Sequence, residues 1–386
     1  MRNRIIAVIF IICIFSIGGL TALRSGLVSE WAHSILGDFS KETIVQTEAS
    51  MDKSIVYRMK WINVNGLFKK YFGVSGDLKK KWYRLDNGTL MYSLPYQSKT
   101  KLSGYADNVK ALKDSLPEGT ELIYVQLPFK IESDEMLPAG AREYANDNQE
   151  FLLKALADRG VKTIDIKQHI YDEGLVYEDQ FYKTDHHWKA EAAKWAADLI
   201  SKRLSEETDW IYDADIYKDE NFKIVHYDDL FLGSLGKKTG NWYAGVDDFD
   251  LILPKFDTDF DFWADSRSGI INRSGDFEHA ILNKDNLKKN YFAINTYATY
   301  TGGDFKENIV TNNLSGNHKK VLLLRDSFSC TLLPFLSLSC EQVTTLDLRH
   351  FKKMSAEDYI KENDFDVVLI AYNASAFTLK QFSFTN

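Results

Sequence analysis

Apolar and polar residues alternate along the chain in two periods, one typical of helices and one typical of buried strands. Short continuous apolar runs bounded by polar residues predict three strands after residue 319, in "KKVLLLRD", "VTTLDLR" and "FDVVLIAYN". Between them lie a helix predicted from Ser327 and the helical segment "SAEDYIKEN". Strands separated by helices predict a parallel sheet with helices on both faces. The pattern therefore assigns this part of the chain to the α/β class.

The same alternation is present earlier in the chain. It predicts a helix from about Gly104 to Leu116, a buried strand in "ELIYVQLPFK", a helix that ends at Gly160, and a strand in "KTIDI". An amphipathic helix follows in "WKAEAAKWAADLISKRL". Residues 205–318 have few helix patterns and many aromatic and acidic residues, which indicates a β-rich or irregular insertion. We expect one globular domain over residues 61–386 that contains this insertion.

The N-terminus has an uncharged apolar run from Ile5 to Leu23. Nineteen helical residues span about 28 Å, close to the thickness of a membrane hydrocarbon core. Arg2 and Arg4 on the short leading side favour an N-terminus in the cytoplasm and the remaining chain outside it. We predict an uncleaved signal-anchor over residues 1–24 and a juxtamembrane segment over residues 25–60; a cleaved signal peptide is the alternative.

The amino-acid composition limits the classes of binding partner that this protein can have. A hydrophobic content of 45% and a formal net charge of −8 are those of a folded acidic protein, which disfavours nucleic acid as a partner. Aromatic residues make up 13% of the chain and suit either carbohydrate surfaces or an aromatic core. Outside the apolar run, Cys330 and Cys340 are either free and buried or joined in a disulfide. The chain has no CxxC zinc spacing.

Two segments that lie far apart in the sequence contain candidate catalytic residues. In "RDSFS" Ser327 stands where an apolar strand turns into a helix, a position suited to a nucleophile or simply to a helix cap. A serine nucleophile needs a base and an acid that orients the base, and Asp185 and His187 in "TDHHW" supply both. In an extended loop residues two apart project to the same side, which would turn His186 away. A metal site at residues 185–187 is the alternative. Such a triplet also needs an earlier strand-end block of His and Asp ligands, and neither "VQLPFK" nor "TIDIKQHI" matches one, so we predict no metal.

The motifs "TDHHW" and "RDSFS" together resemble the DHHW protein family, within the SGNH/GDSL hydrolase-like group that includes alginate and cell-wall polysaccharide O-acetyltransferases. The segments "YVQLPFK", "GSLGKKTG", "YTGGD" and "LIAYNAS" extend the resemblance over most of the chain. It implies a flavodoxin-like three-layer α/β/α domain in which the Asp-His block precedes the serine, an order permuted relative to ordinary GDSL enzymes. Arg325 replaces the glycine of "GDS", which shapes a turn and does no chemistry.

The resemblance also implies roles for individual residues. Ser327 is similar to the nucleophile, His187 to the base and Asp185 to its orienting acid. Asn373 stands where the group places its oxyanion asparagine, beside the backbone amide of Ser327 as the other oxyanion donor. The usual glycine donor has no counterpart near Arg349–His350. As substrate-binding candidates we name four side chains at the strand ends and in the insertion: Arg325, Arg349, Trp242 and Tyr243.

These features favour an extracytoplasmic polysaccharide O-acetyltransferase that works through an acetyl-serine intermediate and needs no cofactor. A carbohydrate esterase or deacetylase would use the same triad and differ only in the acceptor, water instead of a sugar hydroxyl. A non-catalytic glycan-binding protein on the same fold is the third possibility. The resemblance further implies a membrane-bound O-acyltransferase as acetyl donor, a glycan polymer as acceptor, and attachment to the membrane by the N-terminal helix.

Overall fold

The computed structural model describes residues 11–12, 15–21, 55–77, 81–266 and 268–385. By their contacts, the residues divide into two compact units. The smaller unit comprises Met1–Gly73 with Lys238–Tyr243, and the larger comprises Val74–Lys237 with Ala244–Asn386. The predicted motifs "TDHHW" and "RDSFS" both belong to the larger unit.

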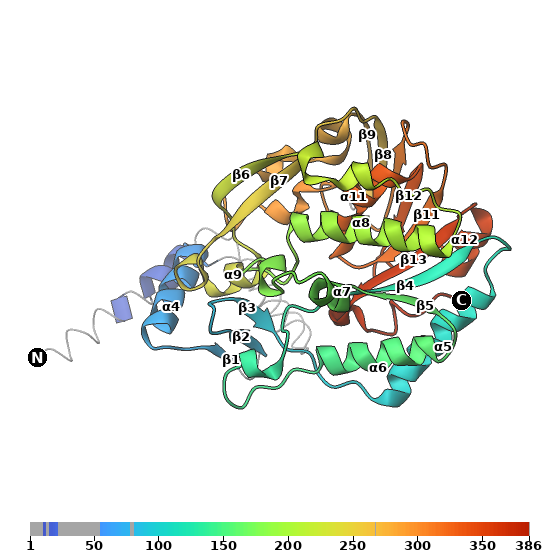
Figure 1. Cartoon of the computed structure of the whole chain (residues 1–386). Helices are drawn as coiled ribbons and strands as arrows, with labels where there is room; N and C mark the ends of the chain where they lie inside the picture. Colours follow the sequence, from blue (N-terminus) through green and yellow to red (C-terminus); the bar gives the residue numbers. More distant parts are fainter. Residues whose placement is uncertain (1–10, 13–14, 22–54, 78–80, 267, 386) are drawn as a thin grey trace, which may run out of the picture. The chain divides into compact units, whose positions relative to one another are not determined.

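An eight-stranded sheet in the order β5-β4-β13-β11-β12-β10-β8-β9 forms the centre of the larger unit (Figure 1). The first five strands run parallel to their neighbours, whereas β10, β8 and β9 continue the sheet in antiparallel pairs. In chain order the strands are β4 (Glu121–Leu127), β5 (Lys162–Asp165), β8 (Phe260–Ser266), β9 (Gly269–Gly275), β10 (Glu307–Asn312), β11 (Lys320–Arg325), β12 (Gln342–Leu346) and β13 (Val367–Asn373). The predicted α/β class is confirmed, with a mixed sheet.

Helices cover both faces of the parallel part of this sheet (Figure 1). They are α5 (Lys99–Asp114), α6 (Ala145–Ala157), α7 (Ile166–Asp172), α8 (Ala190–Glu207), α11 (Ser329–Leu336) and α12 (Ala356–Glu362). Strand residues such as Val125 and Leu323 pack with α8 and α11 in one apolar cluster. On the other face, Tyr372 of β13 contacts the Phe382 ring, which stacks on Tyr105 of α5 with centroids 4.4 Å apart. The central parallel strands β4, β11 and β13 are mostly apolar and buried because both of their faces are covered.

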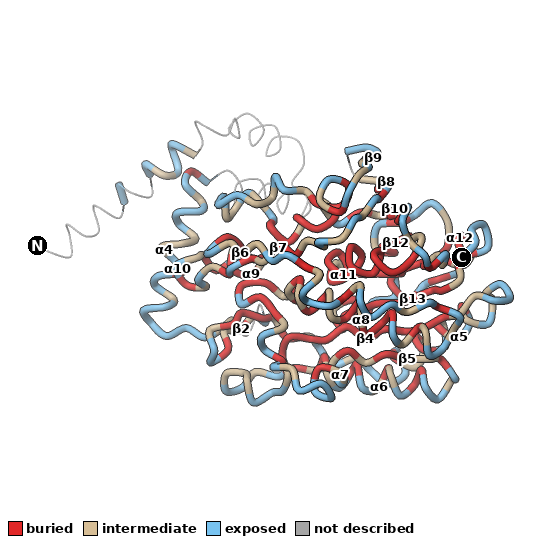
Figure 2. The backbone as a smooth tube through the Cα atoms, turned by 45° about the horizontal axis from the view of Figure 1, so that its top comes forward, coloured by how far each residue is buried: buried red, intermediate tan, exposed pale blue. Residues whose placement is uncertain are grey.

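Burial follows these layers. All residues of β13 and of α11 are buried, and Figure 2 shows buried backbone along β4, β13 and α11 at the centre of the larger unit. Two predicted helix starts differ from the observed ones. Helix α5 begins five residues before Gly104, because Ser98 caps it by accepting a hydrogen bond from the Lys101 backbone amide. Helix α11 begins at Ser329 because residues 326–328 form a turn.

The predicted insertion at residues 205–318 is β-rich, but it is not separate from the sheet. Its strands β8, β9 and β10 extend the central sheet, because alternate residues of β8 (Phe260, Phe262 and Ala264) are buried on one face. A two-stranded sheet of β6 (Phe222–Phe231) and β7 (Asp247–Pro254) completes the insertion. Ahead of it in the chain lies a small sheet of β1 (Gly76–Asp77), β2 (Trp82–Arg84) and β3 (Leu90–Tyr92).

The predicted membrane anchor lies mostly outside the described residues. Residues 11–12 and 15–21 of the run Ile5–Leu23 are described and are helical. Among the described residues, no helix has both the length and the apolar character to cross a membrane. The juxtamembrane segment 25–60 also lies largely outside them, but its predicted boundary at residue 60 falls inside a single helix, α4 (Arg58–Tyr71). Both remaining cysteines, Cys330 and Cys340, are buried and free, so the disulfide alternative is excluded.

Candidate active site

Three predicted side chains meet at the carboxyl edge of the sheet. His187 Nε2 lies 2.9 Å from Ser327 Oγ, although the two residues are 140 positions apart in the sequence. On its other side, His187 Nδ1 lies 2.5 Å from Asp185 Oδ1. Asp185 and His187 are buried. The geometry is that of a serine with a base in reach and a carboxylate that holds the imidazole.

The loop that carries Asp185 is held by a buried cation and a buried anion. The Lys130 ammonium donates to the carbonyl oxygens of Tyr182, of Leu90 at 2.9 Å and of Asp185 at 2.6 Å. The Asp247 carboxylate accepts from the backbone amide of Lys183 at 2.6 Å and from that of Thr184 at 2.7 Å. Burial lowers the pKa of Lys130 to about 7, although Asp247 and Asp185 act in the opposite direction. The loop is thus bound to two side chains on other elements.

Asp185 is in an environment that keeps it charged. Burial alone raises the pKa of this carboxyl, but His186, His187 and the backbone amide of Ser234 outweigh it and hold the pKa well below its usual value. The Ser234 amide donates to Asp185 Oδ2 at 2.5 Å. Ser234 begins α9 (Ser234–Thr239), and Gly233 before it has no side chain because a Cβ there would lie 2.3 Å from the Asp185 Cβ. The "GSLG" segment therefore fixes the position of the Asp185 carboxylate.

His186 does not face away as predicted. Its ring centroid lies 3.8 Å from that of His187, and its Nδ1 lies 3.2 Å from Ser234 Oγ. The prediction assumed an extended backbone, but residues 183–186 form bends and not a strand. His186 is therefore part of the charged cluster around Asp185.

Two aromatic side chains join the loop to the nucleophile turn. The Tyr297 ring stacks on the His187 imidazole with centroids 4.0 Å apart and an interplanar angle of 14°. The Tyr297 hydroxyl and the Trp188 indole each donate to the carbonyl of Phe328 at 2.9 Å. Trp188 is fully buried, and its ring lies 6.1 Å from that of Phe328. Tyr297 belongs to no predicted motif and was missed.

Arg325 and Asp326 fix the end of β11, just before Ser327, through hydrogen bonds of their charged side chains. Asp326 accepts from the backbone amides of Phe328 at 2.9 Å and Asn373 at 2.8 Å. Burial raises the pKa of Asp326 to about 6, even though these amides act in the opposite direction. Arg325 is 1% exposed and donates to the Asp304 carboxylate and to the Phe305 carbonyl at 2.7 Å. Arg325 thus braces the strand end, and its burial gives no support to the predicted contact with substrate.

Asn373 ends β13 next to the nucleophile strand, as predicted. Its side chain is fully buried, and its Nδ2 donates to the carbonyl of Pro128 at 2.6 Å while its Oδ1 accepts from the Ser375 amide at 3.0 Å. One of the two amide hydrogens is thus engaged with Pro128, and the side chain is as buried as that of Arg325, so the oxyanion role of the second hydrogen stays a prediction.

The remaining candidates differ in exposure. Arg349 is one-third exposed and pairs with Asp347 and Asp304, so its charge is already neutralised at the strand edge. Trp242 and Tyr243 lie in α10 (Asn241–Ala244) and belong to the smaller unit. Half of the Trp242 surface is exposed, whereas Tyr243 is 1% exposed and has no face for a sugar, which contradicts its predicted role.

Asp185, His186 and His187 offer ligand atoms close enough to bind one metal ion. However, both ring nitrogens of His187 are in hydrogen bonds, one with Asp185 and the other with Ser327. A metal at His187 would have to break one of them. The arrangement fits proton transfer better than metal ligation.

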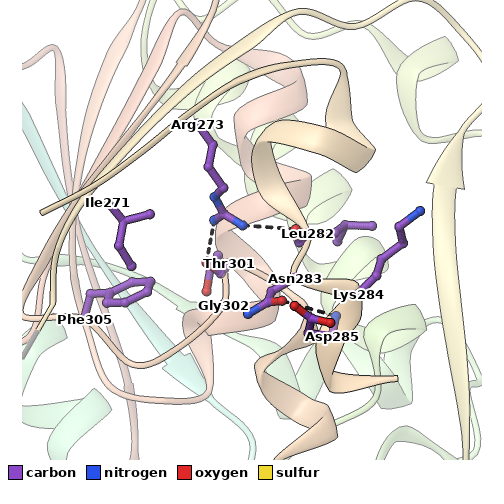
Figure 3. Close-up of a pocket in the computed structure, with 9 residues that line it drawn as sticks. All are labelled: Ile271, Arg273, Leu282, Asn283, Lys284, Asp285, Thr301, Gly302 and Phe305. Atoms are coloured by element: carbon purple, nitrogen blue, oxygen red, sulfur yellow. Dashed lines mark hydrogen bonds between the residues drawn. The ribbon is translucent and has the colours of Figure 1, made fainter. Parts of the chain in front are cut away.

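A pocket of about 500 Å³ lies where the segment after Tyr297 meets β9 (Figure 3). Arg273 lines it and donates to the carbonyls of Thr301 at 2.7 Å and Leu282 at 3.0 Å. Within the described ranges Arg273 forms no ion pair, and burial lowers the pKa of its guanidinium to about 10. Thr301 has a φ of 69° and Gly302 a φ of 96°, so the pocket rim is a strained turn. The "YTGGD" segment therefore lines a pocket beside Arg273, whose guanidinium also lies 4.2 Å from the centre of the Phe262 ring.

Comparisons with known proteins agree with this geometry. Residues 89–220, which include Asp185 and His187 but not Ser327, match the family described as "SGNH hydrolase-like domain, acetyltransferase AlgX". Among curated protein sequences none matches the chain.

Two solved structures share the fold. Bacillus cereus PatB1 with a sulfonyl adduct is 22% identical, with a TM-score of 0.66, over 78% of this chain and 99% of that one. A DHHW family protein from Eubacterium siraeum is 18% identical, with a TM-score of 0.54, over 75% of this chain and 92% of that one. Residues 89–220 are thus similar to an SGNH hydrolase-like acetyltransferase domain, and the chain shares its fold with PatB1 and the DHHW family protein, in agreement with the resemblance drawn from "TDHHW" and "RDSFS".

Proposed function

We propose that this protein is a polysaccharide O-acetyltransferase that works outside the cytoplasm through an acetyl-serine intermediate. The observation that carries the proposal is the continuous hydrogen-bonded chain Ser327–His187–Asp185, with links of 2.9 and 2.5 Å. The matched family, described as an acetyltransferase domain, supports acetyl as the transferred group.

In the first half-reaction, Ser327 Oγ attacks the carbonyl carbon of an acetyl donor while His187 Nε2 takes the hydroxyl proton. The tetrahedral oxyanion collapses, the donor oxygen leaves with the proton from His187, and the acetyl ester of Ser327 remains. Asp185 keeps the Nδ1 proton of His187 in place and stabilises the imidazolium. The low pKa of Asp185 supports this role, because the carboxylate stays ionised throughout the neutral range.

In the second half-reaction, a sugar hydroxyl attacks the acetyl-serine carbonyl and His187 takes the proton of that hydroxyl. The ester bond to Ser327 breaks, His187 returns its proton to Ser327 Oγ, and the acetylated sugar leaves. The oxyanion of each step would be held by the backbone amide of Ser327 and the free amide hydrogen of Asn373. The Tyr297 ring on the His187 imidazole restricts the base to one orientation.

The Arg273 pocket is our candidate for acceptor binding. A half-buried guanidinium without a carboxylate partner in the described chain suits the carboxylate of an acidic sugar. We expect Arg273→Gln to raise the KM for an acidic oligosaccharide several-fold and to leave both kcat and the KM for a neutral one unchanged. Equal KM values for the variant and the wild type would remove this pocket from the proposal.

The donor and the location follow from the resemblance and from the N-terminal sequence. A membrane-bound O-acyltransferase would supply acetyl groups, and the apolar run Ile5–Leu23 would anchor the protein to the outer side of the cell membrane. Fractionation of cells that express the full chain tests the second point. Recovery of the protein in the cytoplasmic fraction would contradict it.

Hydrolysis and transfer differ only in the acceptor, so the test must supply both. The full-length protein is incubated with a chromogenic acetyl ester and polysaccharide oligomers, and acetylated oligomers are quantified by mass spectrometry. Acetylated oligomers that disappear with Ser327→Ala establish transfer, whereas acetate released only to water identifies an esterase. A sulfonyl fluoride that fails to modify Ser327 in the wild type, together with no turnover, would indicate a non-catalytic glycan-binding protein.

A further inference from the structure

Helix α4 in the smaller unit exposes an unusual number of large apolar side chains. Six of them are between 44% and 82% exposed: Tyr57, Trp61, Leu67, Phe68, Tyr71 and Phe72, which we call the α4 aromatic face. The Phe68 and Phe72 rings stack with centroids 6.5 Å apart, and Tyr71 contacts Phe72 edge-on at 5.1 Å. Figure 2 shows exposed backbone along much of this segment. Contiguous exposed apolar surface of this kind marks an interaction site.

The aromatic face lies opposite the side that α4 uses for packing. On that packing side, a Cβ at Gly66 would lie 2.5 Å from the Thr239 carbonyl oxygen, and Asn63 Oδ1 accepts from the Asn241 amide at 2.9 Å. With 3.6 residues per turn, Trp61, Phe68 and Phe72 lie on one line roughly opposite Gly66. The helix therefore has a separate packing side, and the aromatic face is additional to it.

The charged residues in the sequence of α4 and its flanks are all basic. Between Ile55 and Gly76 the sequence holds Arg58, Lys60, Lys69 and Lys70 and no aspartate or glutamate, in a chain whose net charge is −8. Tryptophan and other rings bordered by lysine are typical of helices that lie in the membrane interface. The cores of protein–protein interfaces are instead depleted of lysine. The charge pattern thus favours anionic lipid over a protein partner.

We propose that the α4 aromatic face docks on an anionic lipid bilayer, with the helix lying in the plane of the membrane surface. The position of α4 supports this, because it follows the apolar run Ile5–Leu23 by a few dozen residues, within reach of the same membrane. The contact is independent of the proposed acetyl transfer. It gives the chain a second, interfacial attachment besides the predicted anchor.

The test uses the full chain in vesicles and a nitroxide label that reports locally. Cys13→Ser removes the cysteine in the apolar run, and Cys330 and Cys340 are buried, so a thiol label goes to an introduced cysteine. The test site is Phe68→Cys, with Phe72→Cys as a second. The matched control is Ile224→Cys on β6, which is 58% exposed against 59% for Phe68. Vesicles contain phosphatidylcholine with or without phosphatidylglycerol.

With phosphatidylglycerol, we expect the label at residue 68 to collide several-fold more with oxygen than with a water-soluble nickel chelate, and the label at residue 224 to show the reverse. Lys60→Glu with Lys70→Glu should reduce the ratio at residue 68. A label at residue 68 that is open to the nickel chelate would overturn the proposal. A label shielded from both collision partners would also overturn it, since protein would then cover the face.

Discussion

Two buried aspartates flank the reacting atoms, and their surroundings give them opposite properties. Asp185 lies in the "TDHHW" loop among two imidazoles and the Ser234 amide, and its pKa is held well below the usual value. Asp326 lies at the end of β11, where it accepts from two backbone amides, yet burial raises its pKa to about 6. The nearest positive charges make the difference.

The contrast separates a chemical role from a structural one. Asp185 contacts the His187 imidazole through a side-chain hydrogen bond, so in the proposed mechanism its charge would act on the proton that His187 moves. Asp326 instead joins the turn at Phe328 to the end of β13 and so fixes the position of Ser327. The aspartate beside Ser327 in the sequence is thus not the one that contacts the imidazole next to Ser327.

The largest expected effect comes from Asp185→Asn. The amide has the shape of the carboxylate but not its charge, and it no longer fixes the His187 tautomer. We expect kcat to fall about 10⁴-fold with the fold retained, measured by acetyl-ester turnover and thermal unfolding. A loss of less than tenfold would show that this carboxylate is not the orienting acid.

Gly233→Ala tests the loop without touching a reacting group. The added Cβ would lie 2.6 Å from the Asp185 Cα, so the loop or α9 must shift. A displacement of about 1 Å costs about 10²-fold in activity, and we expect that loss in kcat. The matched control is Gly104→Ala in α5, where nothing lies within 4 Å and the helix should gain about 0.5–1 kcal/mol. Equal activity of both variants would contradict the close packing of Gly233 on Asp185.

Asp326→Asn has a smaller effect on turnover and a distinctive dependence on pH. The pKa of Asp326 is about 6 in the folded protein and about 4 in an unfolded chain, so between these values only the folded state keeps the proton. Raising the pH through this window therefore lowers wild-type stability, and the asparagine variant escapes that loss. We expect the unfolding free energy of the variant relative to wild type to rise by about 2–3 kcal/mol from pH 4 to 6, with kcat within tenfold.

Asp185 has the opposite pH signature, which sharpens the comparison. Its folded pKa lies below the unfolded one, so its contribution to stability is present above about pH 4 and is lost as the pH falls further. Thermal unfolding of both single variants across pH 3 to 7 separates the two aspartates. Parallel curves for the two variants would mean that the environments do not differ as described.

The smallest effects are expected at Tyr297, which contacts both His187 in the Asp185 loop and Phe328 in the turn that Asp326 holds. Tyr297→Leu removes the ring stacked on His187 and should lower kcat a few-fold. Tyr297→Phe keeps the ring and loses the bond to the Phe328 carbonyl, which should cost about 1 kcal/mol of stability and leave kcat within twofold. If Tyr297→Phe lowered kcat more than Tyr297→Leu, the hydroxyl and not the stacked ring would be the important contact.

Much of the fold could be predicted from the sequence, because parallel strands are buried on both faces and therefore occur as short apolar runs. The runs that became β4, β11 and β13 are mostly apolar, β12 is a buried run of valine, threonine and leucine, and the helices between the strands have their own period. The antiparallel extension β8–β10 was less evident, because its alternating residues could equally have formed a separate sheet.

The sequence by itself determined which chemistry was available: a serine at a strand end, an Asp-x-His pair, and the order in which they occur. Only the tertiary structure decided their distances and supports, such as Lys130 on the loop carbonyls, Gly233 against Asp185 and Tyr297 on His187. It also decided that Arg325 is buried and serves the strand end. The physical reason is the distance along the chain over which each property is set. Periodicity and residue type are local properties, whereas a hydrogen bond between residues 140 positions apart depends on how the whole sheet packs.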